Sequence, residues 1–192
     1  MIESNSAYND KETMMLVKEI YKENKKIPSV TLHSFFTKES YEYLLDSVRN
    51  SRRELTQNLL HHRYKICQTN NELSIFLNNK NFAKMFHKIT GRKIKKMNFQ
   101  TLALTWKDYM LLNDKYREKP GIDIIIDLTD NWDYKSGGAM VYVDGTGDYF
   151  PVISQGNSLT IIQRNPTVHR FIKYLNSNAK NKERVIILGN SV

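Results

Sequence analysis

Histidine and cysteine side chains are the first groups to consider for metal binding or acid–base chemistry in this chain. There is a single cysteine, Cys67, so the sequence allows neither an internal disulfide bond nor a zinc site built from several cysteines. Among the five histidines, only His61 and His62 are neighbours in sequence. Adjacent residues point in different directions on a helix or a strand, so this pair does not by itself form a metal site. His33 and His87 have no partner at a metal-binding spacing.

Two further candidates lie in the C-terminal half. His169 precedes a short apolar segment, and Arg184 begins another one. An imidazole can bind a metal ion, and a guanidinium can form a bidentate ion pair with a carboxylate. Taken without their context, both residues are more typical of ordinary strand positions than of a functional site.

The elements that would position these residues differ between the two halves of the chain. Apolar residues at helical spacing predict helices over 10–26, 37–50 and 72–90. Thr37 is expected to be the N-cap of the second helix, and Gly91 the C-terminal cap of the third. A strand is predicted over 30–36, whereas 51–67 favours neither a helix nor a strand.

After Gly91 the pattern changes to short, partly alternating segments separated by turn-forming clusters. Strands are predicted over 96–106, 122–128, 139–143, 158–162, 170–175 and 184–188. Helices followed by regularly spaced short strands predict an α+β fold with an antiparallel sandwich or barrel. The length fits a single domain over 1–192, with a helical support region over 1–91 and a β-structured core over 92–192.

The second half contains several motifs whose order is that of one enzyme family. They are DLTDNW at Asp127–Trp132, SGG at Ser136–Gly138, NSLTII at Asn157–Ile162, PTVHRFIKYL around His169 and ERVIILGNSV around Arg184. The region from Phe99 to Gly189 thereby resembles the prolyl-hydroxylase-like branch of the 2-oxoglutarate/iron(II) oxygenases. The resemblance implies a double-stranded β-helix, which is a jelly-roll-like sandwich, with N-terminal helices packed outside it.

The chemistry of that family depends on a metal ion and a positive charge. Two His and one carboxylate hold Fe(II) on one face and leave positions open for 2-oxoglutarate and O₂, and an Arg or Lys binds the far carboxylate of 2-oxoglutarate. The resemblance assigns His169 to a retained iron-ligand position and Arg184 to the 2-oxoglutarate clamp, and it predicts that both point into one cavity. Trp132 and Gly137-Gly138 are expected to be structural, as an apolar anchor and a turn that needs positive φ or close backbone approach.

The other two iron ligands of the family, a His-x-Asp pair, are missing from their expected place. Counting back from the DLTDNW motif without a gap puts Asn113 and Lys115 in the two ligand positions. Asn offers a weak neutral oxygen, and Lys is a cation. A shift by one residue brings Asp114 into the carboxylate position but puts Leu112 in the His position. No register yields His-x-Asp, because 97–168 contains no histidine.

Two functions from different classes follow. The favoured one is a 2-oxoglutarate/Fe(II) oxygenase-like protein with a degenerate iron site, acting as a non-catalytic binding or partner subunit. The alternative is an active hydroxylase of a peptidyl or amino-acid-like substrate, with Fe(II) and 2-oxoglutarate bound at an atypical site through Asp114 and His169. In the favoured case no cofactor is expected, although the clamp could hold a small dicarboxylate.

The composition limits the classes of binding partner that this chain is expected to have. The net charge is +9, and the basic segment over 80–96 could bind a polyanion. No zinc-finger spacing, RRM signature or helix-turn-helix pattern accompanies it, so a solvated helix face is favoured and nucleic acid is not expected. No apolar run is long enough to cross a bilayer, and the N-terminus lacks a signal pattern, which predicts a cytoplasmic protein without a membrane partner. A protein or peptide partner fits these features, and a homodimer stays open.

Overall fold

The computed structural model describes residues 1–23, 25–94, 97–112, 119–153 and 155–191, apart from the side chain of Ser191. The helices are α1 (Lys11–Glu23), α2 (Lys38–Arg49), α3 (Asn71–Leu77) and α4 (Lys80–Thr90), with short 3-10 helices η1 (Ser6–Asn9), η2 (Tyr134–Ser136) and η3 (Ser177–Ala179). The strands are β1 (Ser29–Leu32), β2 (Arg53–Asn58), β3 (His62–Cys67), β4 (Asn98–Leu104), β5 (Tyr109–Met110), β6 (Gly121–Asp127), β7 (Met140–Val143), β8 (Tyr149–Pro151), β9 (Ser158–Arg164), β10 (His169–Ile172) and β11 (Arg184–Ser191).

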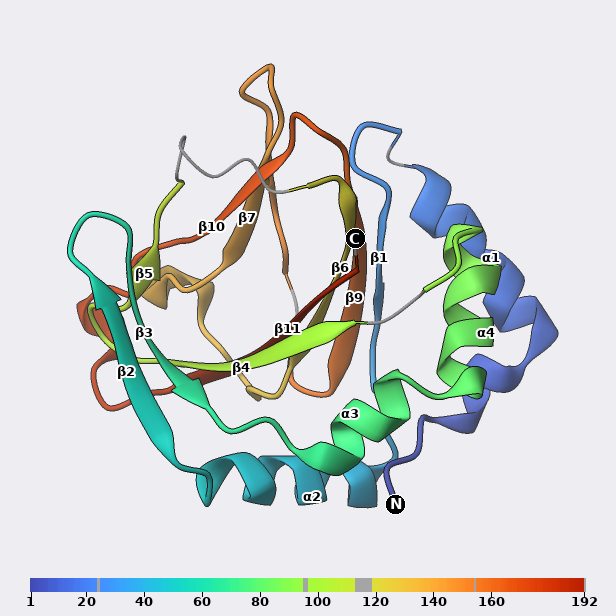
Figure 1. Cartoon of the computed structure of the whole chain (residues 1–192), viewed down its shortest axis with the longest axis horizontal. Helices are drawn as coiled ribbons and strands as arrows, with labels where there is room; N and C mark the ends of the chain where they lie inside the picture. The colour runs from blue at the N-terminus through green and yellow to red at the C-terminus, as the bar shows by residue number, and fades with distance from the viewer. Residues whose placement is uncertain (24, 95–96, 113–118, 154, 192) are drawn as a thin grey trace.

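The strands form one curled antiparallel sheet in the order β1-β9-β6-β11-β4-β3-β5-β10-β7-β8, with β2 paired to β3. The curl places β7 and β10 over β6, so that the sheet makes two layers (Figure 1). The helices lie outside the layer that contains β6, β9 and β11 (Figure 1). The expected α+β class and antiparallel sandwich are therefore confirmed.

Two apolar cores lie on opposite faces of the central layer. Strand β6 shows the division because its side chains alternate. Ile124 and Ile126 belong to the core beneath the helices, whereas Ile125 belongs to the core between the two layers. All of β6 is buried, as expected for a strand covered on both faces.

The helix ends follow the local sequence signals. The Thr37 hydroxyl accepts a hydrogen bond from the Ser40 amide at the start of α2, and Gly91 adopts φ +71° at the end of α4. Both predicted caps are confirmed. The single helix predicted over 72–90 is instead two helices, α3 and α4, because Asn79 caps the second one through its side chain.

The first 91 residues also contribute strands. Strand β1 pairs with β9, and the β2–β3 hairpin occupies the segment over 51–67 that the sequence pattern left unassigned. The support region thus extends the sheet at two places in addition to covering it with helices. In the described ranges, no helix is both long enough and apolar enough to span a membrane.

Candidate functional site

Two buried carboxylates face the space between the two layers. Asp123 and Asp127 are four residues apart on β6 and share the inward face with Ile125. Both aspartates are fully buried. A buried charge is strongly unfavourable unless it is paired and hydrogen-bonded, so the partners of these two groups define the site.

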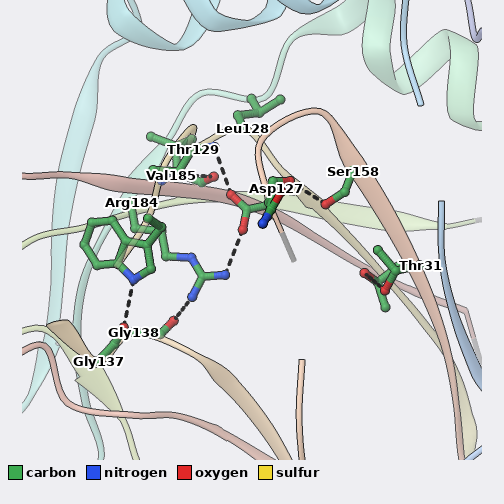
Figure 2. A network of polar contacts seen from close by, with 12 residues as sticks. Thr31, Asp127, Leu128, Thr129, Gly137, Gly138, Ser158, Arg184 and Val185 are labelled. Carbon is green, nitrogen blue, oxygen red and sulfur yellow. Dashed lines mark hydrogen bonds and ion pairs between the residues drawn. The ribbon is translucent and has the colours of Figure 1, made fainter. Parts of the chain in front are cut away.

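The partner of Asp127 is Arg184. The Arg184 guanidinium lies 2.8 Å from Oδ2 of Asp127 and donates a second hydrogen bond to the Gly138 carbonyl at 2.6 Å (Figure 2). The Thr129 amide donates to the other carboxylate oxygen of Asp127 at 2.8 Å. Arg184 is only 1% exposed. The group expected to bind a ligand carboxylate therefore binds a carboxylate of its own chain.

Aromatic rings complete the surroundings of Arg184. Its guanidinium carbon lies 6.0 Å from the centre of the Trp132 ring and 5.7 Å from that of Tyr134, which is within the range of cation–π attraction. The buried Trp132 also donates from its indole N–H to the Gly137 carbonyl at 2.9 Å. The segment that joins β6 to β7 thus contacts the arginine through two aromatic rings and the Gly138 carbonyl.

Gly137 is needed for both of the reasons that the sequence suggested. It adopts φ +81°, and a Cβ atom added there would lie 2.0 Å from the Tyr174 carbonyl oxygen. Gly147 adopts a similar φ of +89°, but nothing lies within 4 Å of its added Cβ. Gly147 is therefore a control for positive φ alone, whereas Gly137 combines positive φ with ψ −154°, a region open essentially to glycine, and with close approach.

We expect Gly137→Ala to lower the free energy of unfolding by roughly 3 kcal/mol or more, because the methyl group is forced into backbone atoms in addition to the φ penalty. Gly147→Ala should cost only about 1–2 kcal/mol, the penalty of the left-handed conformation. Urea unfolding of both variants checks this difference. Equal losses in the two variants would mean that the contact with Tyr174 is relieved at little cost.

The partners of Asp123 form a second, larger cluster. Its Oδ2 atom accepts from Arg164 Nε at 2.9 Å and from the Tyr142 hydroxyl at 2.8 Å, and it lies 2.7 Å from Arg170 Nη1. Arg164 also donates to the Lys119 carbonyl at 2.8 Å. One carboxylate is thus shared by two guanidinium groups that come from β9 and β10.

Burial and the negative charge of Asp123 raise the pKa of Tyr142 well above its ordinary value, and burial raises the pKa of Tyr21 to about 12. A tyrosine whose pKa is raised on folding stabilises the fold fully below its unfolded pKa of about 10, and this stabilisation is lost as the pH rises toward the folded value. We therefore expect the free energy of unfolding to fall above about pH 10.

Absorbance of the phenolate band, followed together with urea unfolding between about pH 9 and pH 12, measures this loss. Tyr142→Phe should make the decline with pH less steep, although it removes the hydrogen bond to Asp123. If Tyr142→Phe leaves the decline unchanged, Tyr142 ionises as freely in the folded chain as in the unfolded chain.

His169 begins β10, and the strand pairing places it on the outer face of its layer. It pairs with Val143, whereas the next residue, Arg170, reaches inward to Asp123. Successive side chains of a strand point to opposite faces, so His169 faces away from the space that Arg184 occupies. This is contrary to the expectation that His169 and Arg184 share one cavity. The assignment of His169 as a metal-ligand position stays a prediction.

The remaining expected positions are Asn113, Asp114 and Lys115, which lie outside the described residues. Within the described ranges, no three His, Cys, Asp or Glu side chains come together closely enough to hold a metal ion.

Sequence reasoning singled out Arg184 but missed the two aspartates and the two arginines that bind Asp123. A signal was present, because Asp123 and Asp127 interrupt a β-branched strand at positions that share a face. Two charges on a strand that is otherwise apolar require buried partners of opposite sign. Arg164, two residues after the strand predicted over 158–162, and Arg170, the first residue of the strand predicted over 170–175, were the available candidates.

The chain matches the model of a family whose description is "oxoglutarate and iron-dependent oxygenase degradation C-term" over residues 56–190. No curated protein matches the chain in sequence.

Among solved structures, a prolyl-4-hydroxylase from Pseudomonas putida is similar with a TM-score of 0.68 and 10% identity, covering 92% of this chain and 98% of that one. A prolyl hydroxylase from Trichoplax adhaerens, solved with a peptide fragment of the oxygen degradation domain of hypoxia inducible factor, gives a TM-score of 0.69 at 10% identity and covers 96% and 94%. At this identity the likeness concerns the fold, and it confirms the expected double-stranded β-helix.

Proposed function

Because the chain belongs to the family described as oxoglutarate and iron-dependent oxygenase degradation C-term, we propose that it keeps the oxygenase fold as a non-catalytic binding or partner subunit. The observation that carries this proposal is the ion pair between Arg184 and Asp127. A 2-oxoglutarate carboxylate would have to displace a buried carboxylate that is already hydrogen-bonded to the guanidinium, and it would then leave Asp127 without its partner. Removing one partner of a buried pair costs several kcal/mol, on the order of 3–5.

The charges between the layers support the same proposal. Three arginines, Arg164, Arg170 and Arg184, place their cations between the layers against only two carboxylates, Asp123 and Asp127. Repulsion between these arginines and Fe(II) disfavours binding of the metal, and the described carboxylates between the layers, Asp123 and Asp127, are already engaged with guanidinium groups. The described residues therefore do not fit an iron site of the family type, and we derive no catalytic step through one.

A peptide or protein segment is the partner class that the comparisons favour. The hydroxylase from Trichoplax adhaerens was solved with a peptide fragment, and the matched family is described by a role in degradation. We infer that this chain retains the recognition of a polypeptide without the chemistry.

Titration calorimetry with 2-oxoglutarate, carried out anaerobically with and without Fe(II) or Mn(II), tests the proposal. We expect no stoichiometric iron, no strengthening of 2-oxoglutarate binding by metal, and no succinate release. Metal-dependent binding together with succinate release would establish the alternative, an active hydroxylase that uses ligands such as Asp114 and His169. The prolyl-4-hydroxylase from Pseudomonas putida is a suitable positive control because it is a hydroxylase with the same fold.

A further inference from the structure

The turn between β4 and β5 carries a tryptophan with two lysines over its ring. Trp106 is 37% exposed. The ammonium of Lys107 lies 4.4 Å from the ring centre. The ammonium of Lys180, which is distant in sequence, lies 4.7 Å from the same ring centre. A cavity of about 540 Å³ adjoins this group and is also lined by Lys182 and Glu183. Exposed tryptophans are among the side chains that most often dominate a protein interface.

The charge exposed around this cavity is positive. The acidic groups nearby are each bound to an arginine: Asp108 is fully buried against Arg63 at 2.5 Å, and Glu183 pairs with Arg53. The lysines that surround the cavity are exposed and form no ion pair with any described carboxylate; they are Lys107, Lys180 and Lys182. The surface therefore complements a negatively charged partner.

The backbone holds the lysines in place. Lys107 adopts φ +74°, in the left-handed region that is unfavourable for a residue with a Cβ atom, and its amide donates to the Leu175 carbonyl at 2.9 Å. The turn is closed by Asp108, which accepts from the Thr105 amide at 2.7 Å and from its hydroxyl at 3.1 Å. On the other side, the fully buried Ala179 anchors the 3-10 helix that precedes Lys180. The backbone beneath the lysines therefore loses little conformational freedom on binding.

We propose that this cavity, lined by Trp106, Lys180 and Lys182 and flanked by Lys107 over the Trp106 ring, is the docking site for an acidic peptide segment that carries a bulky apolar side chain. The apolar side chain packs against the Trp106 ring, and flanking carboxylates of the segment pair with the lysines. This inference rests on the proposed polypeptide-binding role and gives it a location and a partner chemistry. A peptide is favoured over single-stranded nucleic acid because the cavity offers one aromatic ring, whereas nucleic-acid channels stack successive bases on several.

The test uses a short, fluorescently labelled peptide of alternating Glu and Leu, followed by anisotropy with the full chain in the absence of iron and 2-oxoglutarate. We expect saturable binding that weakens when salt is added. In the triple variant Lys107→Glu, Lys180→Glu, Lys182→Glu the dissociation constant should rise about tenfold or more. The matched control is Lys80→Glu, Lys84→Glu, Lys88→Glu on α4, which makes the same change in net charge on exposed lysines elsewhere. This control should bind as the wild type does.

Tryptophan quenching locates the contact. Trp106 is exposed and Trp132 is 8% exposed, so acrylamide quenches the former preferentially, and the bound peptide should protect it. Trp106→Ala should weaken binding of the Glu-Leu peptide and leave binding of a peptide made of Glu alone unchanged.

Equal weakening by both lysine triples would overturn the proposal, because net charge alone would then explain binding. Binding of an oligouridylate in place of the peptide, or no saturable binding, would overturn it as well. None of these outcomes involves iron or 2-oxoglutarate, so each is separate from the calorimetric test of the non-catalytic role.

Discussion

The Asp127→Ala variant is expected to lose about 3–5 kcal/mol of unfolding free energy, because it leaves the guanidinium of Arg184 buried without its carboxylate. For a chain of this length the loss corresponds to a fall in melting temperature of about 6–20 °C. The vacated space has the size of a carboxylate. Added formate should therefore restore part of the stability, because a ligand that binds only the folded state raises its melting temperature.

Thermal unfolding with and without formate measures both effects. The wild type is the control for rescue and should not respond, because Asp127 fills the site. Asp127→Asn keeps an oxygen that can face the Thr129 amide, so its loss should be smaller. Rescue of Asp127→Ala by 2-oxoglutarate as well would show that the clamp is reachable from solvent once its internal partner is removed. A variant as stable as the wild type would contradict the role given to this ion pair in excluding a ligand.

Asp123→Ala is expected to have a still larger effect, at least about 5 kcal/mol, because one carboxylate serves both Arg164 and Arg170. Replacing all three charged members of the cluster should be far less harmful, although the Tyr142 hydroxyl then loses its acceptor. The triple variant Asp123→Leu, Arg164→Met, Arg170→Met has no charge to bury, and apolar replacements of buried ion pairs are often neutral or stabilising.

Urea unfolding of the soluble variants gives the comparison. If Asp123→Ala does not accumulate as a folded protein, recovery of folded protein in the triple variant carries the test. Asp46→Ala is the matched control, because its ion pair with Arg49 is exposed and should be worth no more than about 1 kcal/mol. A triple variant as unstable as Asp123→Ala would mean that the cluster stabilises the fold through its hydrogen bonds rather than through charge neutralisation.

The parts of the fold that sequence predicts are those with local signals. Helix α2 follows from the Thr37 cap and an apolar stripe, and β6 from a run of β-branched residues. Four strands escaped prediction, and two of them, β5 and β8, have only two and three residues, too few for any period to show. The β2–β3 hairpin also escaped prediction, because β2 is largely polar and exposed. The hairpin joins the sheet through the pairing of β3 with β4, which no local sequence pattern reveals.

At the candidate site, too, local sequence patterns do not reveal which residues of different strands come together. Motif order was enough to single out Arg184, but its partner Asp127 lies on another strand and is fixed only when β6 and β11 pair. At β10 the inward position belongs to Arg170 and not to His169. Sequence alone could not separate these two neighbours, because a shift of one residue in strand register reverses every face.

Strand β11 lies between β4 and β6, although it follows both in the chain by a long interval (Figure 1). During synthesis on the ribosome, β4 and β6 therefore emerge with their facing edges unpaired and wait for residues 184–191. Closing a sheet through such distant segments is slow, and open strand edges invite association with other chains. The nascent protein thus passes through a period of exposure to aggregation that ends only when its central strand arrives, and folding helpers that shield strand edges would act in that interval.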